Sequence, residues 1–118
     1  MKLRDFASQI TIDPAKLTIY ALNENHPHGK HKARVFAAAL GYTTENYRSL
    51  LQQIEVQALE AKAELQHVDQ FGQHFRVHLT ITGVAGQVAT IRTGWLVPSG
   101  DQTAILTTLY VIGAGEHD

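Results

Sequence analysis

Residues 73–82 read QHFRVHLTIT, and from Phe75 onward apolar and polar side chains alternate. A period of two residues is typical of a β-strand that has one face in a core and the other in water. The apolar positions are Phe75, Val77, Leu79 and Ile81. This stretch therefore predicts a long strand in a sheet that packs one face against the rest of the protein.

Three more strands are predicted around this one, at residues 65–69, 87–97 and 103–112. The links that follow the strand at 73–82 are short and rich in turn residues, GVAG at 83–86 and PSGDQ at 98–102. Links of this length join neighbouring antiparallel strands as hairpins. We therefore expect a four-stranded antiparallel sheet in the C-terminal half of the chain.

Three helices are predicted before the sheet, at residues 14–23, 30–40 and 44–62. Asp13 is a suitable N-cap for the first helix, and Gly41 suits a left-handed cap at the end of the second. Apolar residues recur at helical spacing along the third. The predicted fold class is α+β, with three N-terminal helices packed on one face of a C-terminal four-stranded antiparallel sheet.

The length of 118 residues and a hydrophobic share of 44% suffice for one folded core. We therefore expect a single domain over residues 1–118, with an ordered core at about 10–112. Cysteine does not occur, which excludes disulfides and thiolate metal sites. The chain also lacks an apolar run of membrane-spanning length and the apolar core of a signal peptide, so a cytoplasmic protein without a membrane partner is expected.

The formal net charge is −1, whereas strong non-specific binding of nucleic acid needs a basic excess. Any contact with nucleic acid must therefore come from a local patch. One such patch is HPHGKHKAR at residues 26–34, which holds three histidines and three permanent cations at the start of a predicted helix.

The position of this patch adds to its meaning. A helix N-terminus presents unpaired N–H groups and a partial positive charge, so it attracts anions and disfavours cations. Cations placed there against this preference predict a site for phosphate or another oxyanion. Helical spacing aligns His31 with Val35 and Lys32 with Phe36, so both should lie at the rim of the interface between helix and sheet.

Other interpretations of the patch remain open. His31 can be an ordinary boundary residue, and Lys32 can lay its methylene stem over Phe36. A metal site is also conceivable, because His26, His28 and His31 form H-x-H-x-x-H and imidazole is a common zinc ligand. The neighbouring lysine and arginine charges disfavour a dication, so we expect a site without a metal or other cofactor.

Polar and aromatic residues in the last two strands form a second candidate group. Arg92 is the only charged residue in its strand, with Thr93 and Trp95 pointing to the opposite face, and Thr108 and Tyr110 share one face. If these strands pair as a hairpin, hydroxyls, an indole and a phenol cluster on the sheet. Threonine, tryptophan and tyrosine are favoured in strands generally, so a purely structural role remains open.

The chain resembles a known family at these residues. The run at 26–36 fits HPxGKHKAxVF, and the further matches are LG at 40–41, GQ at 72–73, TG at 82–83, RTxW at 92–95 and TxY at 108–110. They resemble a bacterial domain of unknown function that occurs alone and as the last domain of large polymorphic toxins. His28 stands where that family usually has an apolar residue, which counts against the three-histidine metal site.

The resemblance implies a toxin-type effector, and the helices-then-sheet layout is similar to the barnase–EndoU–colicin–RelE group of metal-independent ribonucleases. RNA is then the expected substrate and a cognate immunity protein an expected partner. Cleavage of RNA without a metal needs a base, an acid and cations around the phosphate. The residues assigned to catalysis are His31, Lys32, Arg92, Thr108 and Tyr110.

In this assignment His31 serves as the base or the acid, and Thr108 or Thr93 donates a hydrogen bond to a non-bridging oxygen. A nucleobase is expected to stack on Trp95 or Tyr110. The residues assigned to phosphate binding are Lys30, Lys32 and Arg92.

A different class of function fits the same sequence. The near-zero net charge and the ordinary strand composition suit a non-catalytic protein-interaction module. Such a module would form a stable complex with a protein partner and would show no turnover.

Overall fold

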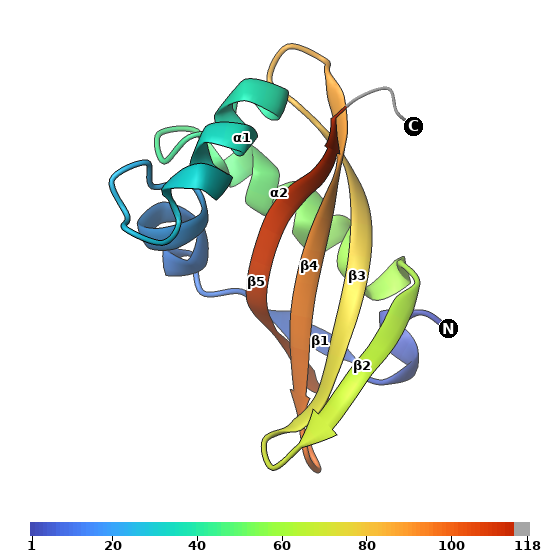
Figure 1. Ribbon diagram of the computed structural model, residues 1–118. Coiled ribbons are helices and arrows are strands. Elements are labelled where there is room, and N and C mark those ends of the chain that lie inside the picture. The colour runs from blue at the N-terminus through green and yellow to red at the C-terminus, as the bar shows by residue number, and fades with distance from the viewer. Residues whose placement is uncertain (115–118) are drawn as a thin grey trace.

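The computed structural model of the protein describes residues 1–114 (Figure 1). In chain order the elements are η1 (Leu3–Asp5), β1 (Gln9–Thr11), η2 (Lys16–Ala21), α1 (Lys30–Leu40), α2 (Tyr47–Gln57), η3 (Ala58–Glu60), β2 (Ala63–Asp69), β3 (Gly72–Thr82), β4 (Val88–Pro98) and β5 (Thr103–Ala114). Here η1 and η3 are 3-10 helices and η2 is a π-helix. The tail expected after the ordered core falls at 113–118, of which 113 and 114 belong to β5 and 115–118 lie outside the described residues.

The sheet has five strands in the order β1-β5-β4-β3-β2. The strands from β2 to β5 form an antiparallel meander, but β1 pairs with β5 in parallel. The prediction of a four-stranded, wholly antiparallel sheet is therefore wrong, and the sheet is mixed. The sequence hides β1 because three residues are too few to show alternation, and because its partner, 103–105, lies at the other end of the chain.

The prediction of three N-terminal helices is also wrong, because α1 and α2 are the only α-helices in residues 1–114. The segment predicted as the first helix forms the short π-helix η2. There the backbone N–H of Leu22 donates to the carbonyl of Leu17 at 2.8 Å. So short a helix has little stability of its own, and the burial of Leu17 and Ala21 in the core decides its form.

The helix predicted at 44–62 begins at Tyr47 and ends as an α-helix at Gln57. The 3-10 helix η3 follows, and the chain is extended from Ala61 onward because the N-terminal segment pairs with it there. The N–H of Leu3 donates to the carbonyl of Ala61 at 3.0 Å, and the N–H of Ala63 donates to the carbonyl of Met1 at 2.7 Å. None of the helices in the described part of the chain has the length and apolar character to cross a membrane.

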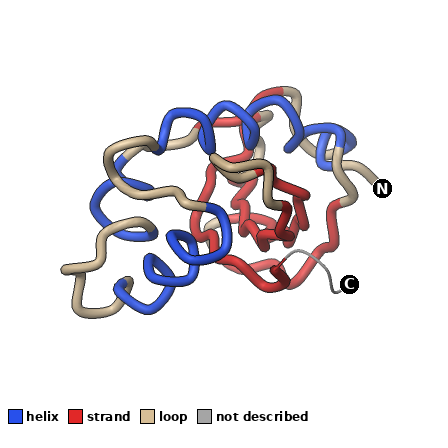
Figure 2. The backbone as a smooth tube through the Cα atoms, turned by 90° about the horizontal axis from the view of Figure 1, so that it is seen from above, coloured by secondary structure: helices blue, strands red, loops and turns tan. Residues whose placement is uncertain are grey.

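One face of the sheet is buried against the helices. Along β3 the buried residues are Gly72 and the four apolar ones of the alternating stretch, and along β4 they run at every second position from Ala89 to Val97. α1 contacts β4 and β5, and α2 contacts β3. Figure 2 shows the helical segments around one side of the curled strands. The largest fully buried side chains are Trp95, Tyr42, Phe36 and Phe75.

Candidate functional site

The side of the sheet opposite the core carries polar side chains, and we call it the open face. It is formed by those residues of β2 to β5 that alternate with the buried ones. A hollow of about 230 Å³ lies on this face. Its lining includes Gln66, His67, His74, Arg76, Arg92, Gly94, Thr107, Thr108 and Tyr110.

Lys32 reaches the edge of the open face from the first turn of α1. Its ammonium nitrogen donates to the hydroxyl of Tyr20 at 3.2 Å and to Oγ1 of Thr108 at 3.5 Å. The same nitrogen lies 5.0 Å from the ring centroid of Tyr20 and 5.1 Å from that of Tyr110. Two aromatic faces and two hydroxyls therefore hold this charge beside β5.

Arg92 continues this group across the sheet. In the strand register it lies opposite Tyr110 on β5 and opposite His78 on β3. Its Nη1 donates to the hydroxyl of Tyr110 at 3.2 Å, and its Nε donates to Nε2 of His78 at 3.1 Å. Tyr110 therefore lies between the Lys32 and Arg92 cations, and the predicted residues Lys32, Arg92, Thr108 and Tyr110 form one cluster.

His78 belongs to the same cluster. Partial burial and the neighbouring Arg92 charge lower the pKa of His78, with Arg76 acting in the same direction and Glu64 against it. The ring is consequently neutral at neutral pH, and it carries a lone pair on the nitrogen that faces Arg92. A neutral imidazole has a lone pair with which it can accept a proton, although the Arg92 and Arg76 charges weaken its basicity.

The positive charge of the cluster is not balanced by carboxylates. The ion pairs within residues 1–114 are Lys2–Glu60, Arg4–Glu60, His67–Asp69 and His74–Asp69. Neither Lys32 nor Arg92 has a carboxylate partner in this part of the chain. Two cations that share a tyrosine and lack a counter-ion make a favourable position for an anion.

Gly94 keeps the floor of the hollow open. It lies opposite Thr108 in the register, where the pairing of β4 with β5 is irregular. A Cβ atom at this position would meet Thr108 Cγ2 at 2.9 Å and Thr107 Oγ1 at 3.0 Å. A side chain here would therefore push against the threonines that border the cluster.

The rest of the cationic helix start has other roles. His26 is a local capping residue, because its Nδ1 accepts the backbone N–H groups of His28 and Gly29, both at 3.0 Å. His31 is exposed and does not line the hollow. Lys30 is half-buried at the first position of α1. His31 and Lys32 were both expected at the rim of the interface between helix and sheet. Lys32 lies there, whereas His31 points to solvent.

Trp95 and Thr93 belong to the core. Trp95 is 1% exposed, its Nε1 donates to Oγ1 of Thr93 at 2.7 Å, and that hydroxyl donates to the carbonyl of Val77 at 2.7 Å. The indole ring is thus packed and hydrogen-bonded inside the protein. Both rings predicted to stack on a nucleobase border the hollow, but Trp95 is too deeply buried to offer a ring face, whereas Tyr110 is half-buried.

A family comparison matches residues 2–113 of the chain to a family described as "Domain of unknown function (DUF6883)". The chain belongs to this family. No curated protein and no solved structure matches it. The open face of this DUF6883 domain therefore has to be interpreted from its own chemistry.

The sequence interpretation missed His78 in this DUF6883 domain. His78 is one of several polar residues in the alternating strand, and nothing local separates it from His74 or Thr80. The sequence did show that His78, like Arg76, falls on the side of the strand opposite the apolar residues. Only the register between β3 and β4 shows that it lies opposite Arg92.

Proposed function

We propose that the open face of this DUF6883 domain binds an RNA phosphodiester and cleaves it without a metal ion. The observation that carries the proposal is the meeting of Lys32 and Arg92 at Tyr110 without a carboxylate counter-ion in the described residues. An effector role in a polymorphic toxin, with a cognate immunity protein as partner, is part of this proposal and rests on the resemblance of the helix-start motif.

The cations of the cluster bind the phosphate in this proposal. The guanidinium of Arg92 offers two parallel donors to the oxygens of a phosphate, and Lys32 adds a point charge from the α1 side. The Thr108 hydroxyl, 3.5 Å from the Lys32 nitrogen, can donate to a non-bridging oxygen. Together these groups stabilise the negative charge that grows on the phosphate during cleavage.

His78 and Tyr110 supply the proton transfers. When Arg92 turns to the phosphate, Nε2 of His78 is released and takes the proton of the ribose 2′-hydroxyl. The 2′-oxygen then attacks phosphorus, and the bond from phosphorus to the 5′-oxygen breaks. Tyr110 accepts its hydrogen bond from Arg92, so its own hydroxyl proton is available for the leaving 5′-oxygen. The products are a 2′,3′-cyclic phosphate and a free 5′-hydroxyl, and the adjacent cations stabilise the phenolate.

The first test is cleavage of bulk RNA and transfer RNA by the purified chain in EDTA. Tyr110→Phe keeps the ring beside Lys32 and removes only the hydroxyl, and His78→Gln removes the base. Each should lower the rate about 10²–10⁴-fold, as is usual for an acid–base residue. Thr80→Ala changes an exposed residue of β3 and keeps its backbone carbonyl, which accepts a hydrogen bond from Gln57, so it should cleave like the wild type.

A second variant, His31→Ala, distinguishes this site from the helix start. His31 is exposed and, unlike His78, makes no hydrogen bond with Arg92, so the variant should retain most of the activity. Loss of activity in His31→Ala with full activity in His78→Gln would instead place the base on α1. Equal cleavage by all proteins would identify a contaminating nuclease and count against the proposal.

A protein-interaction module is the second candidate function, and the edge strand β2 favours it. Every residue of β2 after Ala63 is exposed, including the apolar Leu65 and Val68, and the adjoining turn exposes Phe71. Exposed apolar residues on a sheet edge suit pairing with another chain. Capture of a specific partner that is lost in Leu65→Lys and Val68→Lys, with no cleavage of RNA, would favour this candidate.

A further inference from the structure

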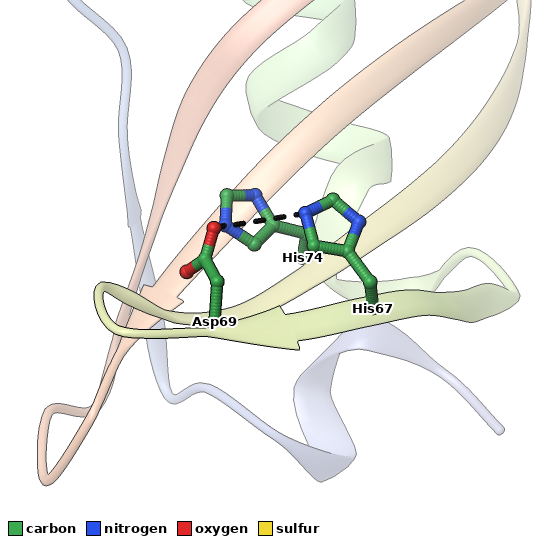
Figure 3. A group of neighbouring side chains, drawn as sticks. All are labelled: His67, Asp69 and His74. Atoms are coloured by element: carbon green, nitrogen blue, oxygen red, sulfur yellow. Dashed lines mark hydrogen bonds and ion pairs between the residues drawn. The ribbon is translucent and has the colours of Figure 1, made fainter.

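The end of the β2–β3 hairpin brings together two histidines and an aspartate (Figure 3). His67 on β2 lies opposite His74 on β3, and Asp69 follows two residues after His67. The two imidazole rings are stacked, with centroids 4.2 Å apart and planes 14° from parallel. The register irregularity between Leu65 and His67 helps to place these groups side by side.

The carboxylate of Asp69 is oriented by the turn. Its Oδ1 accepts the backbone N–H groups of Phe71 at 2.9 Å and Gly72 at 3.3 Å. Its Oδ2 faces both imidazoles, 2.9 Å from Nε2 of His74 and 3.7 Å from Nε2 of His67. Some loss of solvation acts to raise the pKa of the exposed Asp69, but the hydrogen bonds from Phe71, His74 and Gly72 and the attraction of His74 outweigh it and lower the pKa below its usual value.

We propose that His67, Asp69 and His74 form a binding site for a zinc ion. One ligand atom from each residue lies within 4.8 Å of the other two. Bonds of the length that zinc makes to nitrogen and oxygen would bring such atoms to about 3.4 Å from one another in a tetrahedral site. The required shift is therefore a small movement of exposed side chains. A cation would also satisfy both imidazoles, whereas the carboxylate oxygen is within hydrogen-bond distance of His74 alone.

The chemistry of the ligands favours zinc over magnesium and calcium. Two imidazole nitrogens and one carboxylate oxygen suit zinc, whereas magnesium and calcium prefer oxygen ligands. The turn amides that hold Asp69 Oδ1 orient the ligand from behind, in the way that supporting hydrogen bonds do in established metal sites. Three protein ligands leave a fourth position. Because His67 and His74 both line the hollow, this position is accessible to water or to an anionic oxygen there.

The site is independent of the proposed cleavage chemistry, and it departs from the sequence-based expectation of a metal-free protein. Arg76 and Arg92 also line the hollow, and their charges oppose the binding of a dication. A bound zinc ion would add positive charge to the open face and would therefore strengthen the attraction of this face for an anion. Zinc binding is measured without any substrate, so failure of either proposal leaves the other standing.

The test uses the untagged full chain, freed of metal and titrated with zinc chloride in a calorimeter. One zinc per chain is expected, and cobalt chloride should give the intense visible absorption of a four-coordinate Co²⁺ site. His67→Ala is the decisive variant, because His67 makes no hydrogen bond with the carboxylate and its loss should not disturb the hairpin. Its zinc affinity should fall at least about tenfold, the lower end of the effects known for groups around metal sites.

Two controls complete the experiment. Asp69→Asn should also weaken zinc binding, with the far-ultraviolet circular dichroism spectrum showing that the sheet is retained. His28→Ala and His31→Ala remove exposed histidines outside the hairpin and should bind zinc like the wild type. The proposal fails if zinc gives no heat of binding in molar excess, or if the His67→Ala protein binds as tightly as the wild type. Loss of binding in His28→Ala and His31→Ala would place the metal at the helix start.

Discussion

Gly94 is the residue on which the shape of the open face depends most directly. Its missing side chain leaves space beside Thr107 and Thr108, at a break in the regular pairing of β4 and β5. We expect Gly94→Ala to destabilise the protein by about 1–3 kcal/mol, the usual range for an added carbon in a packed position. It should also displace Thr108 and thereby weaken any anion bound by Lys32 and Arg92.

The matched control for this prediction is Gly113→Ala. Gly113 lies in β5, opposite Thr90 of β4, and a Cβ atom there would meet no other atom within 4 Å. Urea unfolding of both variants measures the two free energies. Equal stability of the variants would show that the space beside Thr108 is not restricted and that Gly94 is not needed to keep the hollow open.

The sequence pointed to four residues of the site but not to His78. Lys32, Arg92, Thr108 and Tyr110 could be found because each is a polar residue in a distinctive local pattern. Their meeting depends on pairings between strands and on the approach of α1 to β5, which no local pattern contains. His78 was missed for this reason, since its partner lies on the next strand.

At the scale of elements, the start of α1 is held by an unusual capping side chain. His26 precedes the helix by several residues, and its Nδ1 accepts two backbone N–H groups that lack helical partners. We expect His26→Ala to cost about 0.5–2 kcal/mol, as the loss of a capping side chain does. Because α1 carries Lys32, the variant should also loosen the cluster at Tyr110.

His28→Ala is the appropriate comparison for this variant. The His28 side chain is exposed, and only its backbone N–H takes part in the cap. Thermal unfolding should show a lower midpoint for His26→Ala and an unchanged midpoint for His28→Ala. An unchanged midpoint in both would mean that solvent replaces the cap without loss.

Long elements with a clear period were predictable, and short ones were not. The alternation at 73–82 and its neighbours gave β3, β4 and β5 nearly to the residue. The helical stripe at 44–62 gave α2 but extended it too far, because pairing with residues 1–3 overrides the local preference of 61–63. The metal-ligand group on the β2–β3 hairpin was likewise hidden, since His67 and His74 become neighbours only through the register.

For the molecule as a whole, His78 makes stability depend on pH near neutrality. Its pKa is lower in the folded protein, so the unfolded chain binds more protons as the pH falls below about 6.5, the ordinary value for histidine. Stability is therefore greatest above that pH and decreases as the pH falls through the folded pKa. The charged groups that face His78 are Arg92 on β4, Arg76 on β3 and Glu64 on β2.

Chemical unfolding between pH 8 and pH 5 tests this dependence. The wild type should lose stability on acidification, and His78→Gln should lose less. The carboxyl groups of Asp69 and Glu60, whose pKa values are also lowered, titrate below this range and should not contribute to the difference. Parallel curves for the two proteins would show that His78 is not responsible.

The parallel pairing of β1 with β5 has a consequence for the folding of the protein during its synthesis. Residues 9–11 are synthesised well before their partners at 103–105. Contacts between distant parts of a chain form slowly because a large loop must close first. The nascent chain can form its antiparallel hairpins in order while β1 remains unpaired. Within this domain, the docking of that strand on β5 is then a late step of folding, because it has to wait for residues 103–105.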